Sequence, residues 1–478
     1  MTAEAGKPKK IIPIIPVPSD EKVIPLQTSQ EKIYPRSVSG FFSQWRWGMV
    51  FLTQLVFYGL PWIEWGQRQA VLFDLGARRF YIFGLVLYPQ DFIYLTGILV
   101  VSALSLFLFT AVAGRLWCGY ACPQTVYTEI FLWIEKKVEG DRVARMRRDG
   151  QALSWDKVWR KSAKHVLWLA VALWTGYSFV GYFTPIKQLG GELLQMGMGS
   201  WEVFWVLFYG LATYGNAGFM REQVCKHMCP YARFQSAMFD KDTLIVTYDA
   251  ERGDPRGTRS RKVDPGTLNL GACIDCGLCV QVCPTGIDIR NGLQYECIGC
   301  GACADVCDTV MDKMGYTRGL VKYTTENALK NKWTQAQTWR HILRPRILVY
   351  TTVLTTIVLA MVVSLATRTP FKVNVVRDRG MLARIVSGGK IENVYQLQVM
   401  NATEATQRYK ITAAGLPDLA VISDNIVTVE STQARRLAVR VQAPFEAAAP
   451  GTHAIAFEIN SLDSPGQLSE KSVFMIPR

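Results

Sequence analysis

Residues 273–284 read CIDCGLCVQVCP, and residues 297–308 repeat the same spacing in CIGCGACADVCD. Each run has the form Cys-x2-Cys-x2-Cys-x3-Cys. Thiolates two residues apart can wrap a short loop around one corner of an iron–sulfur cubane, because cysteine sulfur is the usual ligand of such clusters. Gly277, Gly299 and Gly301 would let the backbone approach the metal closely. The two runs therefore predict a compact segment that binds iron and sulfur.

The spacing of the two runs is similar to that of two-cluster bacterial ferredoxins, in which the fourth cysteine of each run binds the other cluster. We therefore expect two [4Fe–4S] clusters, and the expected ligand sets are Cys273, Cys276, Cys279 and Cys307 for one and Cys297, Cys300, Cys303 and Cys283 for the other. Zinc ribbons would need pairs of cysteines separated by longer gaps. Asp308 follows Cys307 where proline is usual, which predicts a change in solvent access rather than loss of a cluster.

Long uncharged blocks predict a membrane protein. The chain has 478 residues, of which 49% are hydrophobic, and a formal net charge of +14. Uncharged blocks of the length needed to cross a bilayer, about 20 residues, occupy residues 47–63, 92–114, 166–183, 203–220 and 347–366. We interpret them as about five spans, with a buried soluble helix as the alternative for the first and fourth. No nucleic-acid-binding signature accompanies the basic charge.

Basic residues near the ends of the blocks predict the orientation. Lys32, Arg36 and Arg46 precede the first block, and residues 136–161 after the second block are rich in Lys and Arg. The loop between the third and fourth blocks has only Lys187. The positive-inside rule then places the N-terminus and residues 221–342 in the cytoplasm and the C-terminus outside, which is the periplasm of a bacterium with its inner membrane. The proline-broken run at residues 11–18 is too short for a signal peptide.

Two further cysteine pairs follow the second and fourth blocks. They are Cys118-x3-Cys122-Pro123 and Cys225-x3-Cys229-Pro230. A spacing of i, i+4 would place each pair on one helical face, and both pairs would lie at the cytoplasmic interface. Thiolates select Cu(I), zinc or iron–sulfur clusters, and His227 is a further candidate ligand. A copper site, a thiol/disulfide pair, a four-cysteine site for another metal centre and simple packing of buried thiols all remain open.

The last 110 residues alternate between apolar and polar positions. Residues 371–376, 394–399 and 437–441 are typical of half-buried strands, and turn signals at residues 387–389 and 450–451 separate them. About seven short strands favour an immunoglobulin-like sandwich. The expected domains are a flexible tail (1–46), a four-span membrane domain (47–220), a cytoplasmic segment (221–342, with the α+β ferredoxin motifs at about 263–315), a fifth membrane helix (343–368) and a periplasmic sandwich (369–478).

The chain resembles the CcoG/FixG/RdxA family of cytochrome oxidase accessory proteins nearly end to end. The resemblance lies in residues 89–92, in GRLWCGYACPQT at 114–125, in YDAERGDPRG at 248–257 and in Arg344-Pro345-Arg346. It implies a role in assembly of the cbb3-type cytochrome c oxidase, in which electrons from the clusters reduce Cu(II) to Cu(I). It also implies that Cys118, Cys122, Cys225 and Cys229 are copper or redox positions.

Two other functions stay open from the sequence. One is a quinol-oxidising electron-transfer subunit, similar to the membrane polyferredoxins of nitrate or nitrous oxide respiration, which share the Cys-x3-Cys-Pro pairs. The other is a non-catalytic assembly scaffold in which clusters only stabilise the fold. The external sandwich favours the accessory family. The sequence names no electron donor, and a cupric reductase remains a hypothesis about its activity.

Overall fold

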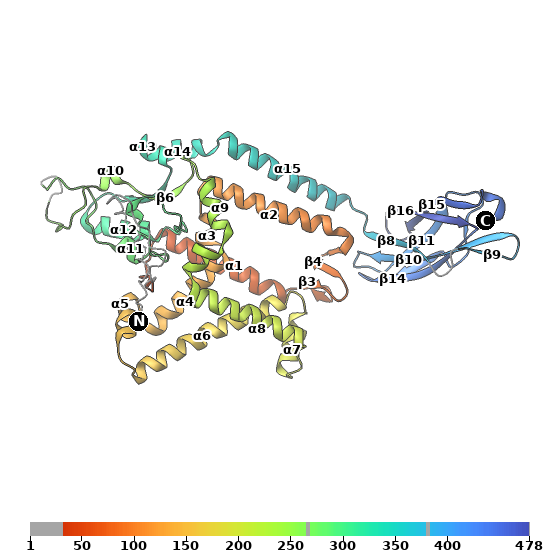
Figure 1. Cartoon of the computed structure of the whole chain (residues 1–478), viewed down its shortest axis with the longest axis horizontal. Helices are drawn as coiled ribbons and strands as arrows, with labels where there is room; N and C mark the ends of the chain where they lie inside the picture. Colours follow the sequence, from red (N-terminus) through yellow and green to blue (C-terminus); the bar gives the residue numbers. More distant parts are fainter. Residues whose placement is uncertain (1–31, 264–267, 379–382, 478) are drawn as a thin grey trace, which may run out of the picture.

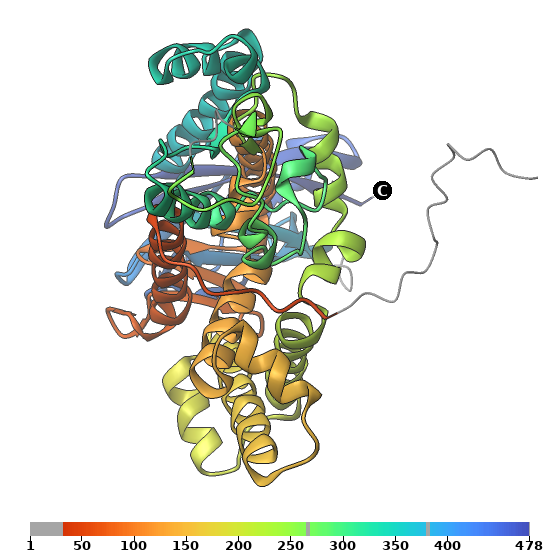
Figure 2. The same cartoon turned by 90° about the vertical axis from the view of Figure 1, so that its left-hand side faces the viewer.

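The computed structural model describes residues 32–263, 268–378 and 383–477. Three parts follow one another along its longest axis (Figure 1). The cysteine-rich segment lies at one end, long helices form the middle, and an all-β domain lies at the other end. Figure 2 looks onto the first of these ends, where the cysteine-rich segment lies in front of the helices. The two ends are therefore separated by the length of the helices.

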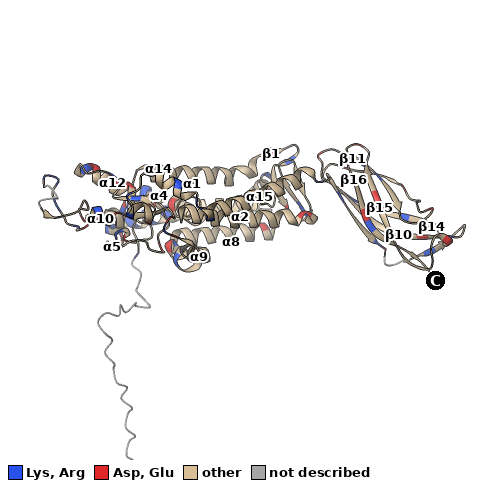
Figure 3. Cartoon of the chain, turned by 90° about the horizontal axis from the view of Figure 1, so that it is seen from above, with Lys and Arg blue, Asp and Glu red and all other residues tan. Residues whose placement is uncertain are grey.

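Within the described residues, two helices are long and apolar enough to cross a membrane. They are Pro89–Ala113, which comprises η2 (Pro89–Asp91) and α2 (Phe92–Ala113), and α15 (Pro345–Thr367). Only 6% of the most apolar window of each is buried inside the protein, so neither is the core helix of a soluble fold. They pack on each other, with the Tyr94 hydroxyl 3.0 Å from the Ser364 hydroxyl. Figure 3 shows few charges along these helices and many Lys and Arg at the cysteine-rich end.

The prediction of about five spans is not confirmed, because the other three blocks fall on different kinds of helix. Helix α1 (Phe41–Gly59) contains Arg46, which is buried. Helix α6 (Trp155–Val180) has a charged N-terminal half that includes the buried Lys164. Helix α8 (Ser200–Gly215) has 16 residues and continues into a π-helical turn, η3 (Asn216–Met220). Polar and charged residues lower the hydrophobicity of α1 and α6, and α8 is apolar but short.

The expected flexible tail is wrong for its last residues. Helix α1 already begins at Phe41, and residues 32–40 run along the cysteine-rich segment, where the Arg36 N–H donates to the Gln281 carbonyl at 2.8 Å. Residues 1–31 lie outside the described part of the chain. The segment docks because its backbone groups find partners on an element more than two hundred residues away, which no local pattern reveals.

The basic loop after α2 is also structured. It forms α3 (Leu116–Tyr120), α4 (Pro123–Glu139) and α5 (Arg142–Gly150). Buried Glu135 of α4 accepts ion pairs from Arg145 at 2.6 Å and from Arg221 at 2.7 Å, and Lys164 pairs with Glu139 at 3.2 Å. These pairs satisfy charges that would otherwise be costly to bury. These ion pairs therefore hold α4, α5 and α6 together through buried charged side chains.

The C-terminal domain is a two-sheet sandwich, as predicted. One sheet has the order β12-β14-β10-β8, with β9 also paired to β10, and the other has the order β13-β11-β15-β16. The bounds are β8 (Phe371–Arg377), β9 (Arg384–Val386), β10 (Lys390–Asn401), β11 (Gln407–Ala414), β12 (Ala420–Val421), β13 (Ile426–Val429), β14 (Ala434–Pro444), β15 (Gly451–Ser461) and β16 (Gln467–Ile476). Tyr395, Phe457 and Phe474 are fully buried between the sheets. Alternation along each strand supplies this core.

A small sheet that the sequence did not predict links the sandwich to the helices. It consists of β3 (Val71–Asp74), β4 (Arg79–Ile82) and β5 (Leu85–Leu87), beside the two-stranded pair β1 (Glu64–Trp65) and β2 (Arg68–Gln69). The Tyr88 hydroxyl donates to the Asn401 carbonyl at 2.9 Å, and Asp91 pairs with Arg368 at 3.4 Å and with Lys372 at 3.3 Å. Short helix α7 (Ile186–Leu194) closes the same end.

The cysteine-rich segment is a small α+β unit. Its sheet pairs β6 (Ile245–Tyr248) with β7 (Val321–Thr324), and its longest helix is α12 (Ala302–Met314). Shorter elements are α9 (Pro230–Met238), α10 (Ala250–Gly253), α11 (Leu278–Gln281), η6 (Ile289–Asn291), α13 (Glu326–Lys330) and α14 (Gln335–Ile342). Its core is small and contains Cys273, with Cys279, Cys303 and Cys307 packed at its edge. A segment with so small a core would gain stability from any metal that its cysteines bind.

Candidate iron–sulfur and thiol site

The structure brings the eight ferredoxin-type cysteines together in two groups around two cavities. Cys273, Cys276, Cys279 and Cys307 line one cavity, and Cys283, Cys297, Cys300 and Cys303 line the other. Each group contains the fourth cysteine of the opposite run, which is the crossed arrangement expected from the spacing. Cys279 borders both cavities, so the two groups are neighbours. The remaining lining is mostly apolar, including Leu278, Ile298 and Val306.

Glycines form the turns that present these cysteines. Gly277 and Gly301 have φ values of 64° and 73°, and each is the residue before the first turn of a helix, α11 or α12. Gly299 has φ 65°, between Cys297 and Cys300. L side chains rarely adopt this conformation. The donor set, the turns and the cavities all fit two four-cysteine clusters.

Burial raises the pKa of several of these thiols. It raises the pKa of Cys297 and of Cys307 to about 12, and neighbouring thiols add to the effect. Iron must therefore displace protons as it binds. Two arginines oppose the accumulation of negative charge, since Arg290 interacts electrostatically with Cys279 and Arg46 with Cys300. Arg46 in turn pairs with Glu129 at 3.1 Å.

The membrane-side cysteine pairs do not lie on continuous helices, so the expected helical face is wrong. Cys118 lies in α3, but Cys122 is extended, with ψ 128°, and precedes Pro123, the first residue of α4. Cys225 lies in the π-helical turn η4 (Val224–Met228), and Cys229 is extended before Pro230 of α9. A residue before proline is disfavoured in the α conformation, and proline suits the first turn of a helix. Each motif is thus a break between two helices.

The four membrane-side thiols nevertheless converge. Cys118 interacts electrostatically with Cys122 and Cys225, and Cys229 interacts with Cys122 and Cys225. All four are partly buried. Burial raises the pKa of Cys118 to about 12; the neighbouring Cys122 adds to this rise and Arg115 opposes it. Burial also raises the pKa of Cys225 to about 11. We call this set the membrane-side thiol group.

The membrane-side thiol group lies directly against the second run of cysteines. A Cβ added at Gly119 would come within 2.9 Å of the carbonyl oxygens of Ile298 and Gly299. Cys118 packs against the small apolar cluster that contains Ile298 and Cys300. Arg115 donates to the Cys297 carbonyl at 3.4 Å and also interacts electrostatically with Cys118 and Cys225. The two groups of sulfur atoms therefore share one packed interface.

His227 and Met228 stand apart from the thiols, since both are exposed and, in the part of the chain that the structure describes, no contact joins the His227 ring to the four cysteines. No three His, Cys, Asp or Glu side chains among the described residues close tightly enough to enclose a single metal ion. This holds for the ferredoxin-type cysteines as well as for the membrane-side thiol group.

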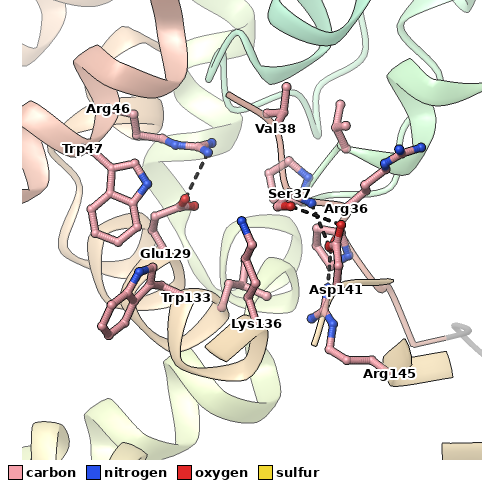
Figure 4. Close-up of a pocket in the computed structure, with 14 residues that line it drawn as sticks. Arg36, Ser37, Val38, Arg46, Trp47, Glu129, Trp133, Lys136, Asp141 and Arg145 are labelled. Atoms are coloured by element: carbon pink, nitrogen blue, oxygen red, sulfur yellow. Dashed lines mark hydrogen bonds and ion pairs between the residues drawn. The ribbon is translucent and has the colours of Figure 1, made fainter. Parts of the chain in front are cut away.

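A small basic cavity of about 100 Å³ borders the second cysteine group through Val282 and Pro284 (Figure 4). Arg36, Arg46, Lys136 and Arg145 contribute positive charge to its lining. The Ser37 N–H donates to Asp141 at 3.0 Å across one side, and residues 35–38 form one wall. Glu129 and Asp141 line the same cavity and offset part of this positive charge.

Three domain families match the chain. A 4Fe-4S dicluster domain matches residues 220–326, a 4Fe-4S binding domain matches residues 95–139, and the IG-like fold at the C-terminal of FixG matches residues 361–477. Nitrogen fixation protein FixG of Rhizobium meliloti (strain 1021) is 37% identical over 425 residues, which is 82% of this chain and 81% of that protein. Protein RdxB of Cereibacter sphaeroides is 39% identical over 426 residues, 87% of this chain and 89% of that protein. The chain belongs to the FixG/RdxA family.

Among solved structures, a FixG-related protein from Vibrio parahaemolyticus matches with 25% sequence identity and a TM-score of 0.21, over 23% of this chain and 97% of that one. As a FixG/RdxA family member with 4Fe-4S domain matches, the chain is an iron–sulfur protein of the electron-transfer type. The resemblance drawn from the sequence is thereby confirmed.

Sequence reasoning missed several residues of this FixG/RdxA family site. Arg115 precedes the first thiol motif, and Gln235 of α9 accepts a hydrogen bond from the Cys118 thiol at 3.3 Å. Arg46 and Arg290 approach the cysteines only through the fold. The sequence gives a weak indication of Arg115, because this charged residue lies at the end of an apolar block beside a cysteine motif. It gives no indication of Gln235, Arg46 or Arg290.

Proposed function

We propose that this chain is a membrane-bound iron–sulfur protein that carries electrons through two [4Fe–4S] clusters and reduces Cu(II) to Cu(I) during assembly of cbb3-type cytochrome c oxidase. The observation that supports it is the shared interface between the second cysteine group and the membrane-side thiol group, through Gly119 and the Ile298–Gly299 backbone. The assembly role rests on resemblance to the accessory family. The partners are the oxidase assembly components and a one-electron donor on the cytoplasmic side.

Exposed apolar side chains support five spans in a bacterial inner membrane. Phe51 and Leu55 of α1 are 68% and 72% exposed, and Phe208 and Leu211 of α8 are 50% and 56% exposed. Such surfaces on several neighbouring helices need lipid to cover them. With the Lys- and Arg-rich helices α4 and α5 on the inner side of the membrane, the cysteine-rich segment is cytoplasmic and the sandwich is periplasmic.

The cysteines and two arginines of the chain hold the proposed clusters and offset their charge. When bound, a [4Fe–4S] cluster accepts and gives one electron at a time. The cysteines Cys273, Cys276, Cys279 and Cys307 hold the first centre, and Cys297, Cys300, Cys303 and Cys283 hold the second. Cys279, at the border of both cavities, keeps the centres adjacent. Arg290 and Arg46 offset the added negative charge.

Copper enters the proposal as substrate. One electron passes from the protein to each Cu(II) ion, which becomes Cu(I), and no bond or proton need change. Cys118, Cys122, Cys225, Cys229 and His227 mark the candidate place of this transfer, because thiolates favour Cu(I) over Cu(II). The exposed His227 and Met228 are accessible to an ion arriving from solution.

The test mixes purified protein with Cu(II). The protein is purified in detergent without oxygen, its clusters are reduced with dithionite, excess reductant is removed, and Cu(II) is added with a Cu(I)-specific chelator. We expect one Cu(I) for each electron that the clusters lose, followed by their absorbance. A protein whose clusters are oxidised by a quinone and not by Cu(II), or by neither, overturns copper reduction.

One cavity bears on the quinol-oxidising alternative. Phe179, Phe183, Trp201, Trp205 and Tyr209 line an apolar cavity of about 590 Å³ beside the start of α8. Helix α8 has 16 residues, a length of about 24 Å, and the thiol Cys225 follows its other end. The cavity therefore lies toward the end of α8 that is farther from Cys225, and none of the cysteines lines it. A scaffold without electron transfer would give normal oxidase assembly after cysteine substitution in residues 273–307.

A further inference from the structure

The membrane-side thiol group is made from two distant parts of the chain. Cys118 and Cys122 come from the break between α3 and α4, and Cys225 and Cys229 come from the break between η4 and α9. The thiols interact electrostatically across the two motifs as well as within them. We infer that Cys118, Cys122, Cys225 and Cys229 together hold a third [4Fe–4S] cluster, adjacent to the cluster of the Cys297 group.

The donor set fits a cluster. Four cysteines with no histidine or carboxylate among them are the usual ligand set of a [4Fe–4S] centre. As with the ferredoxin-type cysteines, no three side chains of this set, within the described residues, are placed to enclose a single metal ion. A cubane has four corners and so needs ligands more widely spaced than those of one copper or zinc ion.

The domain comparison leads to the same ligand count. A 4Fe-4S binding domain matches residues 95–139, and the cysteines in that range are Cys118 and Cys122. Two thiolates supply half of the four ligands that a cubane needs. The two missing ligands are supplied by Cys225 and Cys229, the thiols that the fold brings beside this pair.

The surroundings of the four thiols also fit an anionic cluster. Arg115 interacts electrostatically with Cys118 and Cys225 and donates to the backbone carbonyl of Cys297, so one positive charge serves both centres. Gln235 lies 3.3 Å from the Cys118 sulfur, and its amide can be turned to donate an N–H to a thiolate. Hydrogen bonds and positive charge near the sulfurs are means by which proteins tune such clusters.

The third cluster would complete a row of three centres, from the Cys273 group through the Cys297 group to the membrane-side thiol group. The Gly119 backbone joins the last two, because it packs so closely on Ile298 and Gly299 that a Cβ there would lie 2.9 Å from their carbonyl oxygens. This inference rests on the proposed function only in taking the ferredoxin-type cavities to hold clusters. It makes the membrane-side cluster the electron donor to copper, so the four thiols bind iron and copper does not take them as its own ligands.

Iron counting tests the inference. The full chain is purified and reconstituted without oxygen, and its iron and acid-labile sulfide are measured with its paramagnetic resonance spectrum after reduction. We expect about twelve iron atoms per chain, four for each cluster. The variants Cys118→Ser and Cys229→Ser should each lose about four iron atoms and one resonance component, while the signals of the other two clusters persist.

The matched control is Cys276→Ser, an exposed cysteine of the ferredoxin segment. It should lose a different resonance component and keep the membrane-side one. About eight iron atoms in the unsubstituted chain overturn the inference, whether the four thiols then hold copper or zinc, form disulfides or stay free. If one variant fails to fold, the other variant and the iron count of the unsubstituted chain still decide. If the protein reduces copper but contains about eight iron atoms, only this inference is wrong. If it contains about twelve iron atoms but does not reduce copper, only the proposed function is wrong.

Discussion

The carboxylate of Asp305 accepts a hydrogen bond from the backbone N–H of Ser43 at 2.7 Å, across 262 positions of sequence. It also accepts one from the Phe42 N–H at 3.1 Å. Asp305 lies in α12 between Cys303 and Cys307, and the two N–H groups belong to the first turn of α1. The cap of the first long helix is therefore supplied by the iron–sulfur segment.

The variant Asp305→Ala should loosen this junction. It leaves two N–H groups without their acceptor, and loss of such a cap costs about 1–2 kcal/mol. We expect a lower thermal unfolding midpoint in detergent and faster proteolysis near residue 40, with the iron content initially unchanged. Asp312→Ala, on the exposed side of the same helix, is the control and should do neither. Equal behaviour of the two variants would contradict the assigned cap.

The variant Gly119→Ala should separate the membrane-side thiol group from the second cysteine group. Its Cβ would meet the Ile298 and Gly299 carbonyl oxygens at 2.9 Å, so one backbone must shift, at a cost of about 1–3 kcal/mol. We expect slower Cu(I) formation from reduced protein in stopped flow, with cluster content retained. Gly48→Ala in α1, where a Cβ meets nothing within 4 Å, is the matched control. An unchanged rate in Gly119→Ala would show that electrons do not cross this interface.

The variant Arg290→Gln should lower the reduction potential of one cluster. Arg290 pairs with Asp288 at 2.7 Å and interacts electrostatically with Cys279. Removing its positive charge disfavours the added electron, and we expect a shift on the order of tens of millivolts. A redox titration followed by paramagnetic resonance measures it, with Lys330→Gln on exposed α13 as the control. A rise in potential would contradict this electrostatic assignment.

The contact of residues 32–34 with α5 should weaken in acid. Burial raises the pKa of Asp149, but hydrogen bonds from Lys161, Tyr34 and Lys32 outweigh it, and the net pKa is lowered. Because the folded value lies below the unfolded one, the stabilisation is full above about pH 4 and is lost as the pH falls further. The difference in unfolding midpoint between the unsubstituted chain and Asp149→Asn should therefore shrink in acid. A difference that stays constant would refute this.

The sequence was sufficient where the determinants are local. Ligand spacing in residues 273–307 predicts which cysteines share a cavity, because a cluster and two short loops leave little freedom. Period-two alternation likewise predicts the sandwich, and its strands at residues 371–376, 394–399 and 437–441 lie within β8, β10 and β14.

Where the determinants are tertiary, the sequence was insufficient. The i, i+4 interpretation of the thiol pairs was wrong because Pro123 and Pro230 end the preceding turn at each second cysteine. The small sheet β3–β5 and the docking of residues 32–40 depend on contacts with Asn401 and Gln281, which no nearby residue signals. Helices α1 and α6 combine buried charged residues with apolar faces that point outward. A search for uncharged blocks cannot tell such helices from membrane spans or from buried helices.

Tyr88 and Asp91 tie the sandwich to the start of α2 through Asn401 and Lys372, and Arg368, which follows α15, pairs with the same Asp91. Two packed helices thus act as a spacer of fixed length, about 33 Å for the 22 residues of α2. A partner bound to the sandwich is therefore held about one helix length away from the cysteine-rich end.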